Sequence, residues 1–211
     1  MPSLLERLLG EDSPGEQVDL EQRQSDANDA LQNRVNADAH DIDAAAVTGV
    51  AVVNEGPEGE PIVVPIARFS LGEDVEDPDM NLIWTVVPTA VRVLHDTFGD
   101  VFVRHYDVQF TFDGDELFEA EECRRVAIPP EYAEQLVGDP SFDGAALRGR
   151  LRAEHDIDDE IAPVAWGECK DYTNRNNAAV VTGGTAAAVA VSGSAASCAG
   201  AAGGAAGGGA C

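Results

Sequence analysis

The stretch VFVRHYDVQFTF at residues 101–112, followed by DGDE and then by CRRVAI at residues 123–128, decides the fold of this chain. One parity of the first run is apolar: Phe102, Tyr106, Val108, Phe110 and Phe112. The other parity is polar: His105, Asp107, Gln109 and Thr111. A period of two is typical of a strand that buries one face, and the Asp-Gly step favours a turn. We therefore predict a hairpin over residues 101–128 with an aromatic inner face and a solvated polar outer face.

A second hairpin is predicted upstream. Residues 44–54 and 61–71 are rich in β-branched side chains and flank the turn segment EGPEG at residues 55–59. Pro65 has no N–H to donate to a neighbouring strand, so we expect the second run at a sheet edge or at a bulge.

The segment between the two hairpins predicts one long helix over residues 78–98. Asp77 is a suitable N-cap before Pro78, and Gly99 is a suitable C-terminal stop. The apolar stripe is spaced by three and four residues: Trp84, Val87, Val91, Leu94 and Phe98. Proline destabilises a regular helix interior by about 3 kcal/mol. We therefore expect a kink at Pro88, or a second helix that begins there.

These elements predict an α+β fold, with a roughly four-stranded antiparallel sheet made of two hairpins and the long kinked helix across one face. The remaining expected elements are a polar helix at residues 18–36, short helices at 130–136 and 145–154, and an irregular segment at 163–172.

Three regions follow from the composition along the chain. We expect a partly mobile N-terminal part at residues 1–40, with a short helix at residues 2–10. A single α+β domain is expected at residues 41–172. An Ala/Gly/Ser-rich low-complexity tail is expected at residues 173–211.

The chain is strongly acidic, with 39 Asp and Glu against 13 Lys and Arg, a net charge of -26, and Lys170 as its single lysine. In molar salt the Debye length falls to about 3 Å, so the self-repulsion of such a surface is screened. The pattern indicates the cytoplasm of an extreme halophile that balances external salt with internal salt. The alternative, an acidic protein that binds basic partners, does not explain the scarcity of lysine. So negative a surface disfavours nonspecific binding of nucleic acid or anionic lipid.

The cysteines and the termini bear on location. Cys123, Cys169, Cys198 and Cys211 show no C-x-x-C spacing and no accompanying histidine pair, which disfavours a zinc site. We expect reduced thiols and a cytoplasmic location, because no secretory signal precedes the domain. The uncharged tail leaves open attachment to a membrane or self-association, although it lacks the large apolar residues of a membrane span.

The polar face of the central hairpin is the first candidate site. His105, Asp107, Glu119 and Glu121 would share one sheet face with Cys123. A histidine among carboxylates could bind a divalent metal or act as an acid/base pair. The alternative is an ordinary solvated face. We predict no cofactor, and weakly bound surface cations remain open.

Two arginine clusters are the other candidates. Arg104 and Arg124 fall on the apolar parity with Glu122 as the expected partner, which predicts a structural ion pair rather than an anion site. Downstream lies a second cluster within five residues: Arg148, Arg150 and Arg152. It could contact phosphate or an acidic partner, unless the carboxylates at residues 156–160 pair with it.

The sequence contains no phosphate-binding loop, dinucleotide fingerprint, nucleophile elbow or zinc-protease motif. The leading hypothesis is therefore a non-enzymatic interaction or accessory module with an unknown protein partner. One alternative is a metal-dependent hydrolase that uses the cluster on the central hairpin. The other is a protein tethered to a membrane or to a partner through its tail.

Overall fold

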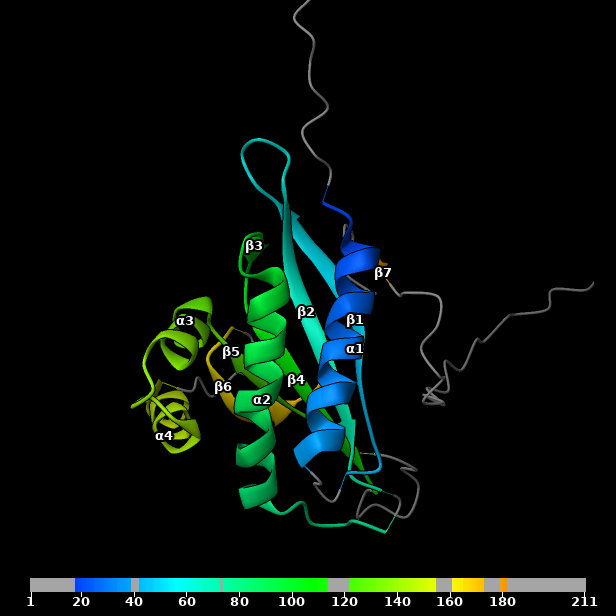
Figure 1. Ribbon diagram of the computed structural model, residues 1–211, viewed down its shortest axis with the longest axis vertical. Helices are drawn as coiled ribbons and strands as arrows, with labels where there is room; N and C mark the ends of the chain where they lie inside the picture. Colours follow the sequence, from blue (N-terminus) through cyan, green and yellow to red (C-terminus); the bar gives the residue numbers. More distant parts are fainter. Residues whose placement is uncertain are drawn as a thin grey trace, which may run out of the picture.

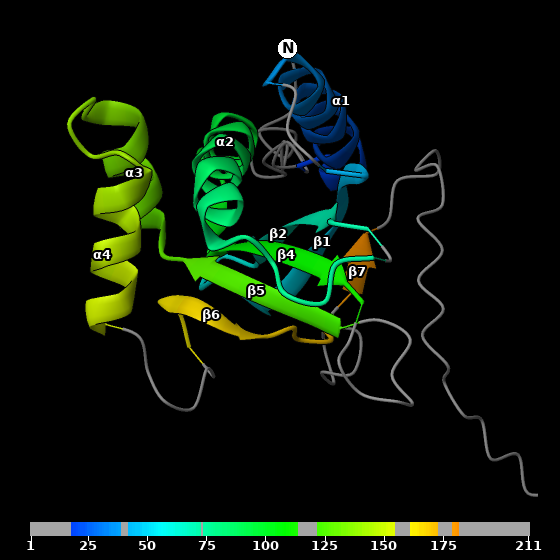
Figure 2. The same cartoon turned by 90° about the horizontal axis from the view of Figure 1, so that it is seen from below.

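The architecture is a mixed sheet with helices on one face (Figures 1 and 2). The computed structural model describes residues 18–38, 42–72, 74–113, 122–154, 161–172 and 179–181. The short helix expected at residues 2–10 lies outside them. Within the described residues, no helix is both long enough and apolar enough to cross a membrane.

The described residues contain seven strands of one sheet. They are β1 Ala44–Glu55, β2 Pro61–Ser70, β3 Phe102–Val103, β4 Tyr106–Phe112, β5 Glu122–Ile128, β6 Val164–Glu168 and β7 Ala179–Val181. The order across the sheet is β6-β5-β4-β2-β1-β7, and β3 also pairs with β2. The α+β class is confirmed, but the sheet is larger than the four strands expected.

The two expected hairpin pairs are present, since β1 pairs antiparallel with β2 and β4 pairs antiparallel with β5. The expectation of an antiparallel sheet throughout is wrong at the seam between them, where β2 and β4 run parallel. The helix α2, Met80–Phe98, connects the two, and a crossover helix is the usual connection between parallel strands.

Pro65 lies in a central strand, so the sheet-edge alternative is wrong. The bulge alternative fits better, because the pairing of β1 with β2 is irregular on both sides of Pro65, between Val47 and Gly49 and between Val52 and Asn54.

The pairing of β2 shows why a central position is tolerated. Its Ile62 and Val63 pair with β3, and its pairing with β4 begins only at Ile66. On this side of β2, Pro65 therefore falls in the gap between the two neighbours, where a strand has no ladder hydrogen bond to lose. On the other side it is paired with Val50 of β1.

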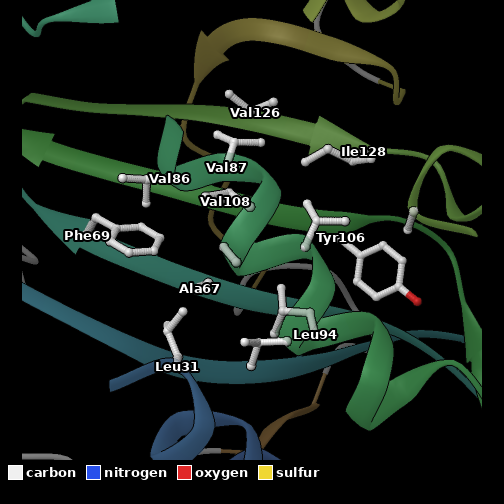
Figure 3. Packing of buried hydrophobic residues seen from close by; sticks show 14 of the residues in the cluster. Leu31, Ala67, Phe69, Val86, Val87, Leu94, Tyr106, Val108, Val126 and Ile128 are labelled. Atoms are coloured by element: carbon white, nitrogen blue, oxygen red, sulfur yellow. The ribbon is translucent and has the colours of Figure 1, made fainter. Parts of the chain in front are cut away.

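Two long helices cover the inner face of the sheet. The first, α1, runs over Leu20–Asp38, close to the expected polar helix, and the side chain of Asp19 accepts from the backbone N–H of Gln22 at its start. Its buried apolar residues recur every four positions: Ala27, Leu31 and Val35. They share one core with α2 and the sheet (Figure 3). A polar helix thus needs only one narrow apolar stripe to be held in place.

The helix α2 begins at Met80, with Asp79 as its cap rather than Asp77, and it ends at Gly99 as expected. It continues through Pro88 as one helix, so the alternative of a second helix is wrong, while the expected kink stays a prediction. Its buried stripe meets apolar residues of β2, β4 and β5 (Figure 3). Each such fully buried side chain contributes about 1.5–3 kcal/mol, enough in sum to outweigh one interior proline.

Two short helices lie on the side of α2 away from α1: α3 at Pro130–Gly138 and α4 at Gly144–Glu154 (Figure 2). Both confirm the sequence expectation. The segment expected to be irregular instead contains β6, which pairs antiparallel with β5. In the region expected to be tail, β7 pairs with β1, and the residues after it lie outside those described.

Candidate functional site

The polar face of the central hairpin is buried, which corrects the expectation of a solvated face. His105 is 6 % exposed and Asp107 is 0 % exposed, and Gln109 and Thr111 are buried as well. Tyr172, four residues after the end of β6, packs on this outer face of the sheet with apolar side chains of β1 and β2. Both faces of β4 are therefore interior, one apolar and the other polar.

Four side chains meet on this face, and we name them the Tyr172 network: His105, Asp107, Arg125 and Tyr172. The hydroxyl of Tyr172 donates to Oδ2 of Asp107 at 2.5 Å. Nε2 of His105 lies 3.0 Å from the same hydroxyl oxygen. Because the hydroxyl proton is directed at Asp107, the imidazole is the donor in this contact.

Arg125 supplies the positive charge of the network. Its Nη1 lies 3.5 Å from Oδ2 of Asp107 and 3.5 Å from the hydroxyl oxygen of Tyr172. Its Nε donates to the backbone carbonyl of Glu168 at 2.9 Å, which ties β5 to the end of β6. The guanidinium and the carboxylate are both almost completely buried.

Burial raises the pKa of Asp107, while the positive charge of Arg125 and the hydrogen bond from Tyr172 act in the opposite direction without reversing the shift. Oδ1 of the same carboxyl group is buried and has no hydrogen-bond partner. Desolvation therefore dominates at Asp107, and the fold stabilises its charged form incompletely.

A disulfide joins Cys123 of β5 to Cys169 at the edge of the network. The expectation of reduced thiols is wrong for these two residues. Cys123 lies two residues before Arg125, and Cys169 lies three residues before Tyr172. The backbone N–H of Cys169 also donates to the carbonyl of Cys123 at 3.3 Å. Cys198 and Cys211 lie outside the described residues.

Only two of the four residues of the expected metal cluster lie within the described part of the chain. Glu119 and Glu121 lie outside the described residues, whereas His105 and Asp107 both contact Tyr172. Among the residues that the structure describes, no group of three or more His, Cys, Asp or Glu side chains is placed to hold a metal ion. The metal-dependent hydrolase stays a prediction.

The expected ion pair is confirmed in one half. Arg124 forms a salt bridge with Glu122. Arg104 is exposed and lies before β4 begins. Because Phe112 pairs with Glu122, Arg104 and Glu122 lie at opposite ends of the hairpin, so the expected pairing of these two residues is wrong.

The arginines of α4 lie beside aromatic rings. The guanidinium carbon of Arg148 lies 5.7 Å from the ring centroid of Trp84, and that of Arg150 lies 5.9 Å from the ring centroid of Tyr132. Arg150 also pairs with Glu154 at 3.7 Å, and Arg152 is exposed. The carboxylates at residues 156–160 lie outside the described residues.

Two nitrogen atoms at this surface are buried without an acceptor: Nε1 of Trp84 and Nε of Arg148. An unsatisfied buried donor is unfavourable by about 1–3 kcal/mol, so any acceptor that reached these atoms, whether water, an anion or a partner group, would stabilise the structure. We name the surface formed by Trp84, Tyr132, Arg148, Arg150 and Arg152 the α4 arginine face.

Sequence reasoning grouped Arg125 with Arg104 and Arg124 rather than with Asp107, and it missed Tyr172 as a member of a site. The pairing of the hairpin contained a signal for Arg125, since it lies directly opposite Gln109 and diagonally from Asp107. Tyr172 carried no such signal, because its place on the sheet depends on how β6 pairs with β5.

Comparison of the chain with protein-family models, with curated proteins and with solved structures gives no match.

Proposed function

We propose that the chain is a non-enzymatic binding module of a halophile's cytoplasm, and that its α4 arginine face holds an acidic segment of a partner protein. The observation that supports this most is the pair of unsatisfied donors, Nε1 of Trp84 and Nε of Arg148, in one cation–π contact. Both donate hydrogen bonds only, so the complementary group is an acceptor.

The pairing of the basic side chains favours an anionic ligand at this face. Four basic side chains elsewhere in the described residues pair with carboxylates: Arg23 with Asp100 at 2.5 Å, Arg34 with Asp96 at 3.6 Å, and Arg124 and Arg125 with Glu122 and Asp107. Arg152 is exposed and forms no ion pair within the described part of the chain. Arg148 and Arg152 lie one helical turn apart, and a carboxylate bound between them would offset the repulsion of their like charges.

Salt decides which forces remain for such a contact. In multimolar salt, attraction between separated charges is screened over about 3 Å, so long-range steering is weak. Direct hydrogen bonds and stacking on aromatic rings act at contact distance and are retained. Arginine beside tryptophan and tyrosine is also the residue combination most enriched at binding hot spots.

The test uses a short, blocked poly-glutamate peptide as the probe, added to the full chain in multimolar KCl. We expect a saturable shift of the Trp84 indole N–H resonance in NMR spectra, because this proton would gain an acceptor. The substitution Arg148→Gln should weaken the apparent affinity by at least about tenfold, the effect of losing a hydrogen bond to a charged group.

Arg34→Gln is the control, because Arg34 is also a helical arginine but is exposed, lies on α1 and pairs with Asp96. Its affinity for the peptide should equal that of the unmodified chain. An indole resonance that does not move, or that moves equally in Arg148→Gln, would contradict the proposal.

A further inference from the structure

The disulfide and the Tyr172 network share two short segments of chain. Cys123 and Arg125 lie on the same face of β5, since they are two residues apart on one strand. On the other side, Glu168, Cys169 and Tyr172 follow one another within five residues. The carbonyl of Glu168 accepts from Arg125, and the hydroxyl of Tyr172 donates to Asp107. Along the chain, Cys169 therefore lies between two residues, Glu168 and Tyr172, that both contact the network.

We propose that the Cys123–Cys169 disulfide is a reversible redox switch that determines whether Tyr172 stays closed over the His105–Asp107–Arg125 cluster. This inference concerns the face of the sheet opposite the helices and does not rest on the α4 arginine face. It also gives the disulfide a role in a cytoplasm, where disulfides that do form are commonly transient and redox-sensing.

The position of the switch follows from what holds each part of the segment. β6 is held to β5 by backbone pairing at Arg124 and Arg125 up to Glu168. After Glu168 the strand pairing ends. One further backbone hydrogen bond runs from the N–H of Cys169 to the carbonyl of Cys123, and the disulfide is the covalent connection between this segment and β5. Tyr172 comes three residues later. Its hydroxyl contacts all three other members of the network, and its side chain packs with apolar residues of β1 and β2.

The network has a reason to open once that connection is broken. Asp107 is buried with Oδ1 unsatisfied, and it faces a guanidinium at the long distance of 3.5 Å. Water that entered beside Tyr172 would hydrate both charges and supply the missing donor to Oδ1. When Tyr172 is closed over the cluster, water is kept out and these solvation contacts are not made. The Cys123–Cys169 disulfide therefore shifts the balance toward the closed state.

The chemistry requires a dithiol reductant, either a protein dithiol or a small molecule. One reductant thiolate attacks a sulfur of the Cys123–Cys169 bond and forms a mixed disulfide, and the second reductant thiol displaces it. The sulfur–sulfur bond of this chain breaks, two protons and two electrons pass to its cysteines, and the reductant is left as a disulfide. Both cysteines are half-buried, so a reductant can approach them.

The experiment measures backbone hydrogen exchange of the full chain in multimolar KCl, before and after reduction with dithiothreitol, with free thiols counted to show complete reaction. We expect the amides of residues 168–172 to exchange at least about tenfold faster after reduction, a change that corresponds to about 1.4 kcal/mol. The amides of β1 and β2 should be unchanged, and removal of the reductant with reoxidation should restore slow exchange.

Two variants make the result specific. The double substitution Cys123→Ser with Cys169→Ser should show fast exchange at residues 168–172 and no response to dithiothreitol, which also controls for Cys198 and Cys211. Tyr172→Phe should show a smaller response than the unmodified chain, because its ring remains but its hydroxyl contacts are gone. Unchanged exchange in a fully reduced chain would overturn the proposal. Faster exchange throughout β1 and β2 would also overturn it, since the disulfide would then be a structural crosslink of the whole domain.

Discussion

Asp107 is a residue at which opposing physical effects meet, and burial is the largest of them. It has a positively charged neighbour and a hydroxyl donor, yet burial keeps its pKa above the usual range of a carboxyl group. A raised pKa means that the folded chain holds the proton of Asp107 at a pH where the unfolded chain has released it. The free energy of unfolding must therefore fall as the pH rises from the pKa of Asp107 in the unfolded chain to its higher pKa in the folded chain.

Asp107→Asn tests that sign. The amide does not titrate in this range, so between about pH 4 and neutrality the variant should lose less stability than the unmodified chain. The measurement is the midpoint of urea unfolding at a series of pH values in constant multimolar KCl. The variant's absolute stability also reflects the loss of a counter-ion for Arg125, so the readout is the difference in slope with pH.

Asp100→Asn is the control of opposite sign. The hydrogen bond from Arg23 lowers the pKa of Asp100, so this carboxylate stabilises the fold above its unfolded pKa, and that contribution is lost as the pH falls through its folded pKa. Parallel slopes for the Asp107 variant and the unmodified chain would contradict the assignment of Asp107.

For single residues, the sequence predicted which side chains share the polar face but not that this face is buried. His105 and Asp107 share a face as their period of two requires. The same period is compatible with solvent or with a polar interior, and the difference here is made by Tyr172, from a segment far away in the chain. No local pattern contains that information.

At the scale of elements, the contact between α2 and α4 depends on one glycine. Proline at position 88 cannot donate to the carbonyl of Trp84 one turn earlier. Gly144, the first residue of α4, packs against this region: a Cβ atom there would lie 2.7 Å from the Trp84 carbonyl oxygen and 2.9 Å from Cγ of Pro88. The two helices can approach because position 144 has no side chain.

A matched pair of substitutions in α4 tests this contact. Gly144→Ala should destabilise the chain by about 1–3 kcal/mol, the usual range for overpacking. Gly149→Ala in the same helix has open space around it and should stabilise by about 0.5–1 kcal/mol through helix propensity. Thermal unfolding of both variants in multimolar KCl measures the effect. Equal effects of the two substitutions would show that the contact at Gly144 is not limiting.

The elements that sequence predicted best are those with a strong local pattern. The long helix, the two short helices and the strands of both hairpins were found, because each contains its own periodicity and stop signals. The central position of β2 was missed, because Pro65 argues locally for an edge and is tolerated through the particular spacing of β3 and β4. β6 was missed for a similar reason: its five residues form a strand by pairing with β5.

At the scale of the whole molecule, the net charge of -26 is the dominant property. Between multimolar salt and 0.1 M salt the screening length grows from about 3 Å to about 10 Å. Repulsion between carboxylates on different parts of the surface then increases, and it favours the more expanded unfolded state.

We therefore expect the melting temperature to fall steeply when KCl is diluted from multimolar concentration to 0.1 M, a dilution that lengthens screening to about 10 Å. Replacing the lost KCl with sucrose at equal osmolality should not restore it, because sucrose strengthens burial without screening charge. Calorimetry in the two solutions checks this. A chain equally stable in both conditions, or fully restored by sucrose, would contradict the halophile interpretation.

The pairing of β7 with β1 has a consequence for the growing chain on the ribosome. Val50 pairs with Val181, so β1 receives its outer neighbour only after almost the entire domain has been made. Domains tend to fold from the N-terminal side during synthesis, and β1 and β2 can pair early because they adjoin in the chain. Each nascent molecule then passes through a stage in which the outer edge of β1 is unpaired, the kind of edge at which strands of different chains associate. The closing strand comes from the uncharged region that follows Asn176, so repulsion between β7 and the acidic domain does not delay it.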